Sequence, residues 1–67
     1  MNYQKLGDRI KKIRKNKPMS QEDLAAEMKI DVRTVVALEG GRRNPTLKTI
    51  NKLAKALGIP VHELLKF

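Results

Sequence analysis

The chemistry available to this chain is dominated by lysine and arginine, whose cationic side chains bind phosphate and carboxylate groups. The sequence holds 15 of them against seven aspartate and glutamate residues, a formal net charge of +8 on 67 residues. This balance favours a polyanionic partner, nucleic acid first and an anionic membrane surface second, although a merely solubilising surface is the alternative. Tyr3 and Phe67 are the only aromatic residues, which disfavours single-strand binding by base stacking.

Few other side chains offer chemistry. The chain has no cysteine, so disulfides and thiolate metal ligands are excluded. His62 is the single histidine, and a metal site needs more ligands than the chain offers. The sequence shows no paired nucleophile and base, glycine-rich phosphate loop or carboxylate pair in an evident pocket, and Ser20 is better explained as a helix cap. We therefore expect no catalytic residue, no metal and no cofactor, and a protein that is not an enzyme.

The length and hydropathy of the chain indicate how many domains it has and whether it contains a signal or membrane segment. Residues 1–67 suffice for one domain, and we expect a single one. Met1 is followed by polar and charged residues rather than by the apolar run of a secretory signal. No apolar stretch approaches the roughly 20 residues needed to span a bilayer. We expect a cytoplasmic protein that does not bind membranes.

Apolar spacing and capping residues predict five helices and no strand. Leu6, Ile10 and Ile13 stand at i, i+4 and i+7, which makes one apolar stripe along the first helix. Basic residues off that stripe are expected to form mostly a charged outer face: Lys5, Arg9, Lys12 and Lys15. The five predicted segments, with N-cap residues included where one is assigned, are Asn2 to Asn16, Ser20 to Lys29, Asp31 to Glu39, Thr46 to Leu57 and Val61 to Lys66.

Short polar residues indicate where the inner helices begin. Ser20 is followed three positions later by Asp23, a pattern close to a capping box, and Asp31 and Thr46 are further N-cap candidates. Gly58 is expected to end the fourth helix. The residues expected to face inward in helices two to four are Leu24, Ala25, Met28, Val32, Val35, Leu38, Leu47, Ile50, Leu53, Ala54 and Leu57.

The most restrictive spacing lies in residues 21–39, where two short helices are joined by a tight turn. The apolar anchors of this unit are Leu24, Met28, Ile30, Val35 and Leu38. Ala25 stands where the two helices would cross, and a larger side chain there would push the helix axes apart. This set is much more specific than two adjacent amphipathic helices.

At these residues the sequence resembles the lambda-type Cro/repressor family, also called the XRE family of helix-turn-helix regulators. The resemblance runs from Leu6 to Leu65. The segments that carry it are Leu6–Arg14, Ser20–Ala26, Leu38–Pro45 and Leu53–Ile59. It implies an all-α, five-helix lambda-repressor-like DNA-binding domain over residues 1–67, with the third helix in the major groove of double-stranded DNA.

The resemblance also implies roles for particular positions. The predicted base contacts are Val32, Arg33, Val36 and Ala37. The predicted phosphate contacts are Gln21, Thr34, Arg42, Arg43, Asn44 and Lys48, of which Thr34 is assigned from its place on the third helix alone. An ion pair between Arg14 and Glu39 is expected to join the first helix to the third.

The sequence departs from the family pattern in three ways. Lys29 occupies the turn position that is usually glycine, and Gly40 replaces the usual asparagine after the third helix. The predicted reading face is also apolar, since Val32 and Val36 cannot hydrogen bond to base edges and could only touch thymine methyl groups. Arg33 is then the main direct reader, most naturally of guanine. The face could instead read sequence weakly or meet a protein partner.

The residues and the resemblance together predict a sequence-specific transcriptional regulator, similar to the Cro/repressor proteins. We expect it to bind a palindromic operator as a homodimer. The C-terminal segment holds more apolar residues than so small a domain needs, and part of them could form the dimer contact: Ile59, Val61, Leu64, Leu65 and Phe67. The alternative is a protein-interaction or antitoxin-like module on the same fold. The sequence does not indicate which operator is bound or whether the regulator activates or represses transcription.

Overall fold

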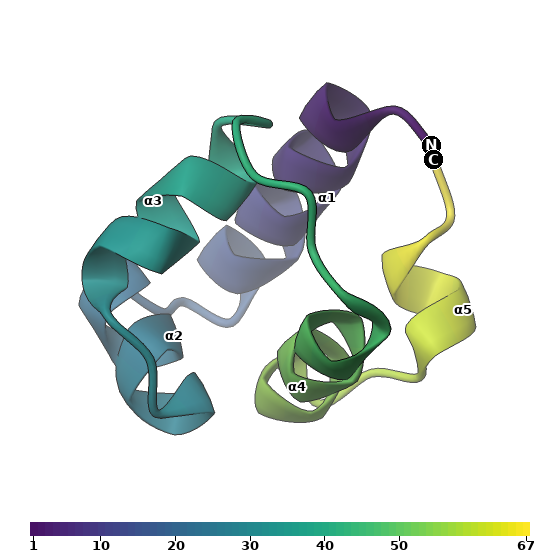
Figure 1. Ribbon diagram of the computed structural model, residues 1–67. Helices are drawn as coiled ribbons and strands as arrows, with labels where there is room; N and C mark the ends of the chain where they lie inside the picture. Colours follow the sequence, from purple (N-terminus) through teal and green to yellow (C-terminus); the bar gives the residue numbers. More distant parts are fainter.

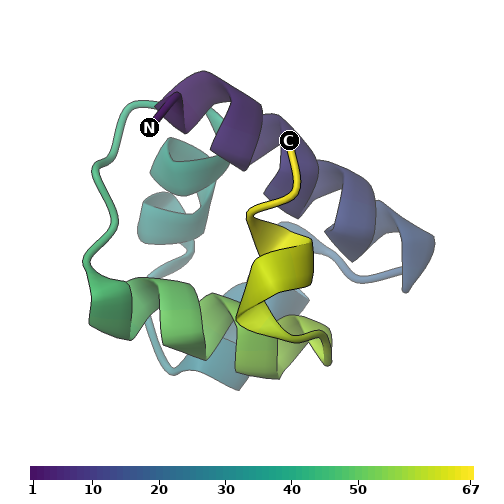
Figure 2. The same cartoon turned by 90° about the vertical axis from the view of Figure 1, so that its right-hand side faces the viewer.

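The computed structural model describes all 67 residues and contains five α-helices and no strand. The helices are α1 (Tyr3–Asn16), α2 (Gln21–Met28), α3 (Val32–Glu39), α4 (Leu47–Leu57) and α5 (Val61–Leu64) (Figure 1). The all-α, five-helix architecture predicted from the sequence is thus confirmed. Figure 2 shows α5 standing between α1 and α4, with the two ends of the chain near α1.

The predicted caps form as the residue types indicate. Ser20 Oγ accepts a hydrogen bond from the Asp23 amide at 2.9 Å, and the Asp23 carboxylate accepts one from the Ser20 amide at 3.0 Å. Asp31 and Thr46 cap α3 and α4 through their side chains, which accept from the Arg33 and Thr49 amides. Each cap satisfies an amide that the first helical turn leaves without a partner, so local chemistry decides where these helices begin.

Lys29 makes the tight turn between α2 and α3 by adopting a left-handed conformation, with φ 56° and ψ 45°. It is the only residue other than glycine with positive φ. Its amide donates to the Ala26 carbonyl at 3.1 Å, and the Ile30 amide donates to the Ala25 carbonyl at 3.0 Å, which closes the end of α2. A side chain in this conformation costs about 1 kcal/mol relative to glycine.

The core draws on all five helices. Its largest fully buried side chains are Leu6, Ile10, Leu24, Val35, Leu53, Leu57 and Leu64. Ala25 is buried on α2, which packs against both α3 and α4. The C-terminal apolar residues mostly complete this core, because Leu64 is fully buried and Ile59, Val61 and Leu65 pack against it.

The inward orientation predicted for Leu47 is wrong, since this side chain is 72% exposed. Leu47 is the first residue of α4, and a helical side chain leans toward the N-terminus of its own helix. It therefore points beyond the end of the core that Ile50 and Leu53 fill.

The predicted fifth helix is also too long at its C-terminal end, because α5 stops at Leu64 instead of Lys66. The Glu63 carbonyl accepts hydrogen bonds from the Arg9 guanidinium at 2.9 and 3.1 Å. The same carbonyl accepts from the Lys66 amide at 3.4 Å, and the Phe67 amide, which would bond to it in a longer helix, donates to the Leu65 carbonyl instead. Arg9 is consequently a structural link between α1 and α5 and not a free part of a charged outer face.

Gly7 lies buried on α1 where this helix approaches the C-terminal end of α3. A Cβ atom at this position would lie 2.6 Å from the Leu38 carbonyl oxygen and would also clash with that of Glu39. The missing side chain therefore allows the two helices to approach closely. This contact holds the end of α3 in place.

Candidate nucleic-acid interface

Helix α3 presents the face that its apolar spacing predicts. Val35 is fully buried and Leu38 is 2% exposed, so these two residues anchor the helix on the core. The Arg33 side chain is 88% exposed, and Val36 is exposed beside it. The remaining predicted base contacts are partly covered, because Val32 packs against the core and Ala37 is half-buried. Among the four predicted base contacts, Arg33 is thus the one long cationic side chain, and the other three are apolar.

A buried ion pair fixes the C-terminal end of this helix. The Arg14 guanidinium donates to the Glu39 carboxylate at 2.6 and 3.0 Å, and to the Met19 carbonyl at 2.7 Å. Arg14 is 7% exposed and Glu39 is 4% exposed. The hydrogen bonds to Glu39 raise the pKa of Arg14, so the guanidinium is charged at any physiological pH. The expected pair is present, and it ties α1 to α3.

Gln21 joins the same network. Its side-chain amide donates to the Glu39 carboxylate at 3.1 Å, from a half-buried position at the start of α2. Sequence reasoning assigned Gln21 to phosphate contact alone and missed this link, because nothing in the local sequence pairs residues 18 positions apart. One amide hydrogen is committed to Glu39, and the second is left for another acceptor.

The N-terminus of α3 holds a second, exposed ion pair. Asp31 Oδ1 accepts from the Arg33 amide at 2.8 Å and from Arg33 Nε at 3.1 Å, and Asp31 Oδ2 accepts from Arg33 Nη2 at 2.7 Å. The side-chain hydrogen bond from Arg33 is the main cause that lowers the pKa of Asp31 to about 2. The same carboxylate therefore caps the helix and holds the predicted reading side chain.

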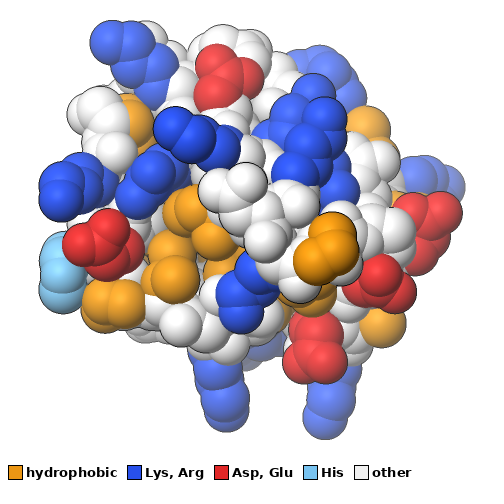
Figure 3. All heavy atoms as spheres, turned by 180° about the vertical axis from the view of Figure 1, so that it is seen from behind, with side chains coloured by type: hydrophobic (Ala, Val, Ile, Leu, Met, Phe, Trp, Pro, Cys, Tyr) orange, Lys and Arg blue, Asp and Glu red, His pale blue; other side chains and the backbone are white.

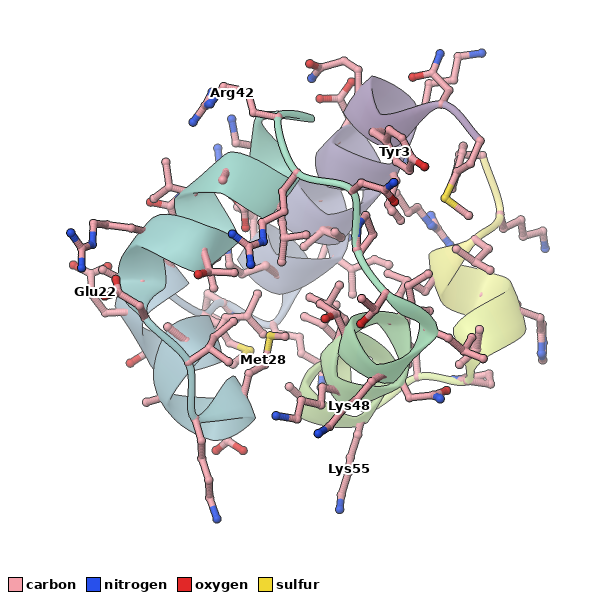
Figure 4. The ribbon with its side chains drawn as sticks, in the orientation of Figure 1. Tyr3, Glu22, Met28, Arg42, Lys48 and Lys55 are labelled. Atoms are coloured by element: carbon pink, nitrogen blue, oxygen red, sulfur yellow. The ribbon has the colours of Figure 1, made fainter.

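The loop after α3 and the start of α4 supply exposed polar side chains. Arg42, Arg43, Asn44 and Lys48 are all exposed, and no side-chain hydrogen bond or ion pair within the chain engages them. In Figure 4, Arg42 lies beyond the end of α3 near the start of α1, and Lys48 points outward from α4. The loop that joins α3 to α4 runs between them. Thr34 is half-buried on α3.

Positive charge is not confined to the α3 side of the molecule. The view from behind shows Lys and Arg side chains over that face as well, with hydrophobic side chains exposed near His62 (Figure 3). The positive charge therefore acts at long range from more than one side of the molecule, whereas the hydrogen-bonded side chains described above lie at the two ends of α3.

Two open clefts, of about 330 and 300 Å³, are lined mainly by charged side chains. Neither brings a nucleophile next to a general base, and no three His, Cys, Asp or Glu side chains converge on a point that could hold a metal ion. None of the helices is both long enough and apolar enough to cross a bilayer.

Comparison with known sequences places these features in context. A family model described as Helix-turn-helix, HTH_3, matches residues 10–64. The chain is 39% identical over 62 residues to the HTH-type transcriptional regulator DdrOP3 of Deinococcus deserti, which covers 92% of this chain and 48% of that protein. It is 38% identical over 61 residues to the control protein C.MunI of a Mycoplasma species, covering 90% of this chain and 82% of that protein. The chain thus spans about half the length of DdrOP3.

Solved structures show the same arrangement of helices. The restriction-modification controller protein C.AhdI from Aeromonas hydrophila superimposes with a TM-score of 0.90 at 42% identity, over 92% of this chain and 94% of that one. The controller protein C.Esp1396I, bound to a 25 base pair operator site, superimposes with a TM-score of 0.88 at 32% identity. That match covers 98% of this chain and 87% of C.Esp1396I.

Proposed function

This chain belongs to the XRE-type helix-turn-helix family, and from that premise we propose that it is a sequence-specific DNA-binding regulator of transcription. Residues 1–67 form the DNA-binding domain, act in the cytoplasm and perform no catalysis. Similarity to transcriptional regulators and to controller proteins supports the proposal, as does the operator bound by C.Esp1396I, a protein of the same fold.

The orientation of α3 is the observation that carries this function. Val35, Leu38 and Glu39 face the core, so the opposite side of a short helix projects from the surface with Arg33 at its front. A helix of this width fits the major groove of B-form DNA, where base edges differ between all four base pairs. If Val35 had been exposed and Arg33 buried, the helix could not read DNA.

Contacts to DNA divide between reading and anchoring. Arg33 reads a guanine, and Val32, Val36 and Ala37 contact the bases beside it through apolar atoms, with thymine methyl groups as their natural partners. The phosphate contacts are Gln21, Thr34, Arg42, Arg43, Asn44 and Lys48. These charged and polar contacts supply most of the affinity and none of the direct sequence information.

The regulator acts as a homodimer. Two copies related by a twofold axis place their α3 helices in successive major grooves, which requires half-sites about 34 Å apart. Phe67 is 47% exposed at the end of the chain, next to the half-buried Leu65. We assign this C-terminal surface, with Val61, to the contact between the two copies.

Selection of bound duplexes from a random pool tests the function directly. We expect an enriched palindrome whose half-sites are separated by one helical turn, two chains bound per duplex, and affinity that falls steeply with salt. Arg33→Ala should flatten the preference at one position of each half-site, while Lys12→Ala, on the α1 surface beside Arg9, should not.

Two results would contradict the proposal. One is an unenriched pool. The other is the absence of salt-sensitive binding to any duplex at micromolar protein and low salt. The second result would favour a protein-interaction module that uses the apolar surface around Val36.

A further inference from the structure

The guanidinium of Arg33 has two edges that can each donate a pair of parallel hydrogen bonds, and the structure uses only one of them. The Nε–Nη2 edge faces Asp31, with distances of 3.1 and 2.7 Å to its two carboxylate oxygens. On the Nη1–Nη2 edge, Nη1 makes no hydrogen bond within the chain and Nη2 bonds only to Asp31, and the side chain is 88% exposed. Nη2 carries two hydrogens, so its bond to Asp31 leaves one hydrogen directed outward.

A guanine in the major groove presents two acceptors, O6 and N7, to an approaching side chain. Two parallel donors from one guanidinium edge match them, and the free edge of Arg33 supplies such a pair. Asp31 is itself held, because its Oδ1 atom also accepts from the Arg33 amide at 2.8 Å as the N-cap of α3. The carboxylate therefore has a fixed position relative to the helix that enters the groove.

We propose that Asp31 is a specificity-determining positioning residue, which holds Arg33 so that its Nη1–Nη2 edge is presented to guanine. This inference rests on the proposed function. A long arginine side chain without a partner loses rotamer freedom when it docks on a base, and Asp31 imposes that order before DNA arrives. The carboxylate also repels phosphate, which keeps Arg33 from acting as a non-specific backbone anchor.

Because the other predicted base contacts are apolar, the selectivity of α3 depends on how Arg33 is held. Val32, Val36 and Ala37 have no polar side-chain atom, so recognition of a G·C pair by hydrogen bonds depends on Arg33. A guanidinium that swings freely could donate to guanine, to a neighbouring acceptor or to a phosphate. Removing the carboxylate should therefore lower the preference for the G·C pair without weakening binding to duplexes of unrelated sequence.

The test uses two substitutions that keep a helix cap. Asparagine and serine are both good N-cap residues. Asp31→Asn retains one oxygen near Arg33, whereas Asp31→Ser is too short to hold the guanidinium. Glu27→Gln is the charge-matched control, because Glu27 is exposed on α2 and makes no side-chain hydrogen bond or ion pair. The probes are the duplex selected by the unmodified protein and copies in which one G·C pair per half-site is changed to A·T.

The unmodified protein should prefer one particular G·C pair over A·T by about 10-fold, and Arg33→Ala should abolish that preference, which identifies the pair. Asp31→Ser should lower the preference to below about 3-fold while binding to an unselected duplex becomes tighter. Asp31→Asn should fall between the two, and Glu27→Gln should leave the preference unchanged. In the Arg33→Ala background, Asp31→Ser should have no effect on the preference.

Full G·C preference in folded Asp31→Ser, verified by a thermal melt, would overturn the inference and leave Asp31 as a helix cap alone. An equal loss of preference in Glu27→Gln would overturn it too, because net charge would then explain the effect. Failure of the proposed function looks different, since the unmodified protein would then select no sequence at all.

Discussion

Glu39 shows how much of this molecule depends on a single side chain. Its carboxylate accepts hydrogen bonds from Arg14 of α1 and Gln21 of α2, while its backbone belongs to α3. Three helices thus meet at one buried charge. The pair contributes most through the cost of breaking it, since either partner alone would be a buried charge without a counterion.

We therefore predict that Glu39→Ala lowers the free energy of unfolding by about 3–5 kcal/mol, because it leaves the Arg14 guanidinium buried and unpaired. Glu27→Ala, at an exposed position on α2, is the control and should have little effect. Urea melts followed by circular dichroism measure both. Equal destabilisation by the two substitutions would show that the Arg14–Glu39 pair does not hold the helices together.

The Asp31 carboxylate makes stability depend on pH in the acid range. Its pKa is about 2 in the folded protein, against a reference value of 3.8. The stabilisation from this group is fully present above the unfolded pKa and is lost as pH falls through the folded one. The free energy of unfolding should thus decrease as pH falls from about 4 to about 2.

Asp31→Asn should reduce that decrease, because asparagine caps the helix without titrating. Thermal melts of both proteins across this pH range give the comparison. Asp23, whose pKa is lowered by hydrogen bonds with Ser20, contributes in the same direction in both proteins and cancels. Identical pH profiles would rule out the Asp31–Arg33 pair as a source of stability.

At the scale of elements, the distance between α1 and α3 is set by Gly7. Helix propensity alone predicts that alanine stabilises α1 by about 0.5–1 kcal/mol relative to glycine. The packing predicts the opposite, since the added methyl group would meet the carbonyl oxygens of Leu38 and Glu39. The two physical effects differ in sign, so a single measurement separates them.

We predict that Gly7→Ala destabilises the protein by about 1–3 kcal/mol and weakens DNA binding, because α1 and α3 must move apart. The control is Lys11→Ala, an exposed position on the same helix. Denaturant melts and duplex titrations measure the two effects. A stabilised Gly7→Ala protein would mean that the close approach of these helices is easily relieved.

At the scale of the whole molecule, charge acts in two ways. In the proposed function, the positive charge on the surface draws the protein toward DNA, whereas a few exposed side chains beside α3 contact phosphates. The salt dependence of binding distinguishes these roles, because only residues that neutralise phosphates change the number of released counterions.

Arg42→Ala should weaken binding to all duplexes to a similar extent, and should lower the slope of log K against log salt by about 1 per subunit. Lys12→Ala, on the α1 surface near Arg9, removes the same charge and should leave the slope nearly unchanged. Titrations at several salt concentrations provide the slopes. A larger change in the slope for Lys12→Ala than for Arg42→Ala would show that the phosphate contacts lie on α1.

Several features of this protein could be predicted from the sequence because they depend on neighbours within a few residues. The caps at Ser20, Asp31 and Thr46 satisfy amides two or three positions away. The periodic spacing of Val35 and Leu38 determines which side of α3 is buried, and thereby which side is left for a partner. The starts of the inner helices and the side of α3 that is buried follow from such local rules, whereas the turn position at Lys29 was indicated by the family resemblance.

The family resemblance indicated the Arg14–Glu39 pair, but only the tertiary structure decided the other contacts between distant charged and polar residues. Arg9 binds the end of α5 from 54 positions away, and Gln21 reaches Glu39 across 18. Leu47 belongs to an apolar pattern but points past the core, and Gly7 matters because another helix happens to pass beside it. Periodicity identifies the face of a helix, but which neighbour meets that face, and where the core ends, depends on how all five helices pack together.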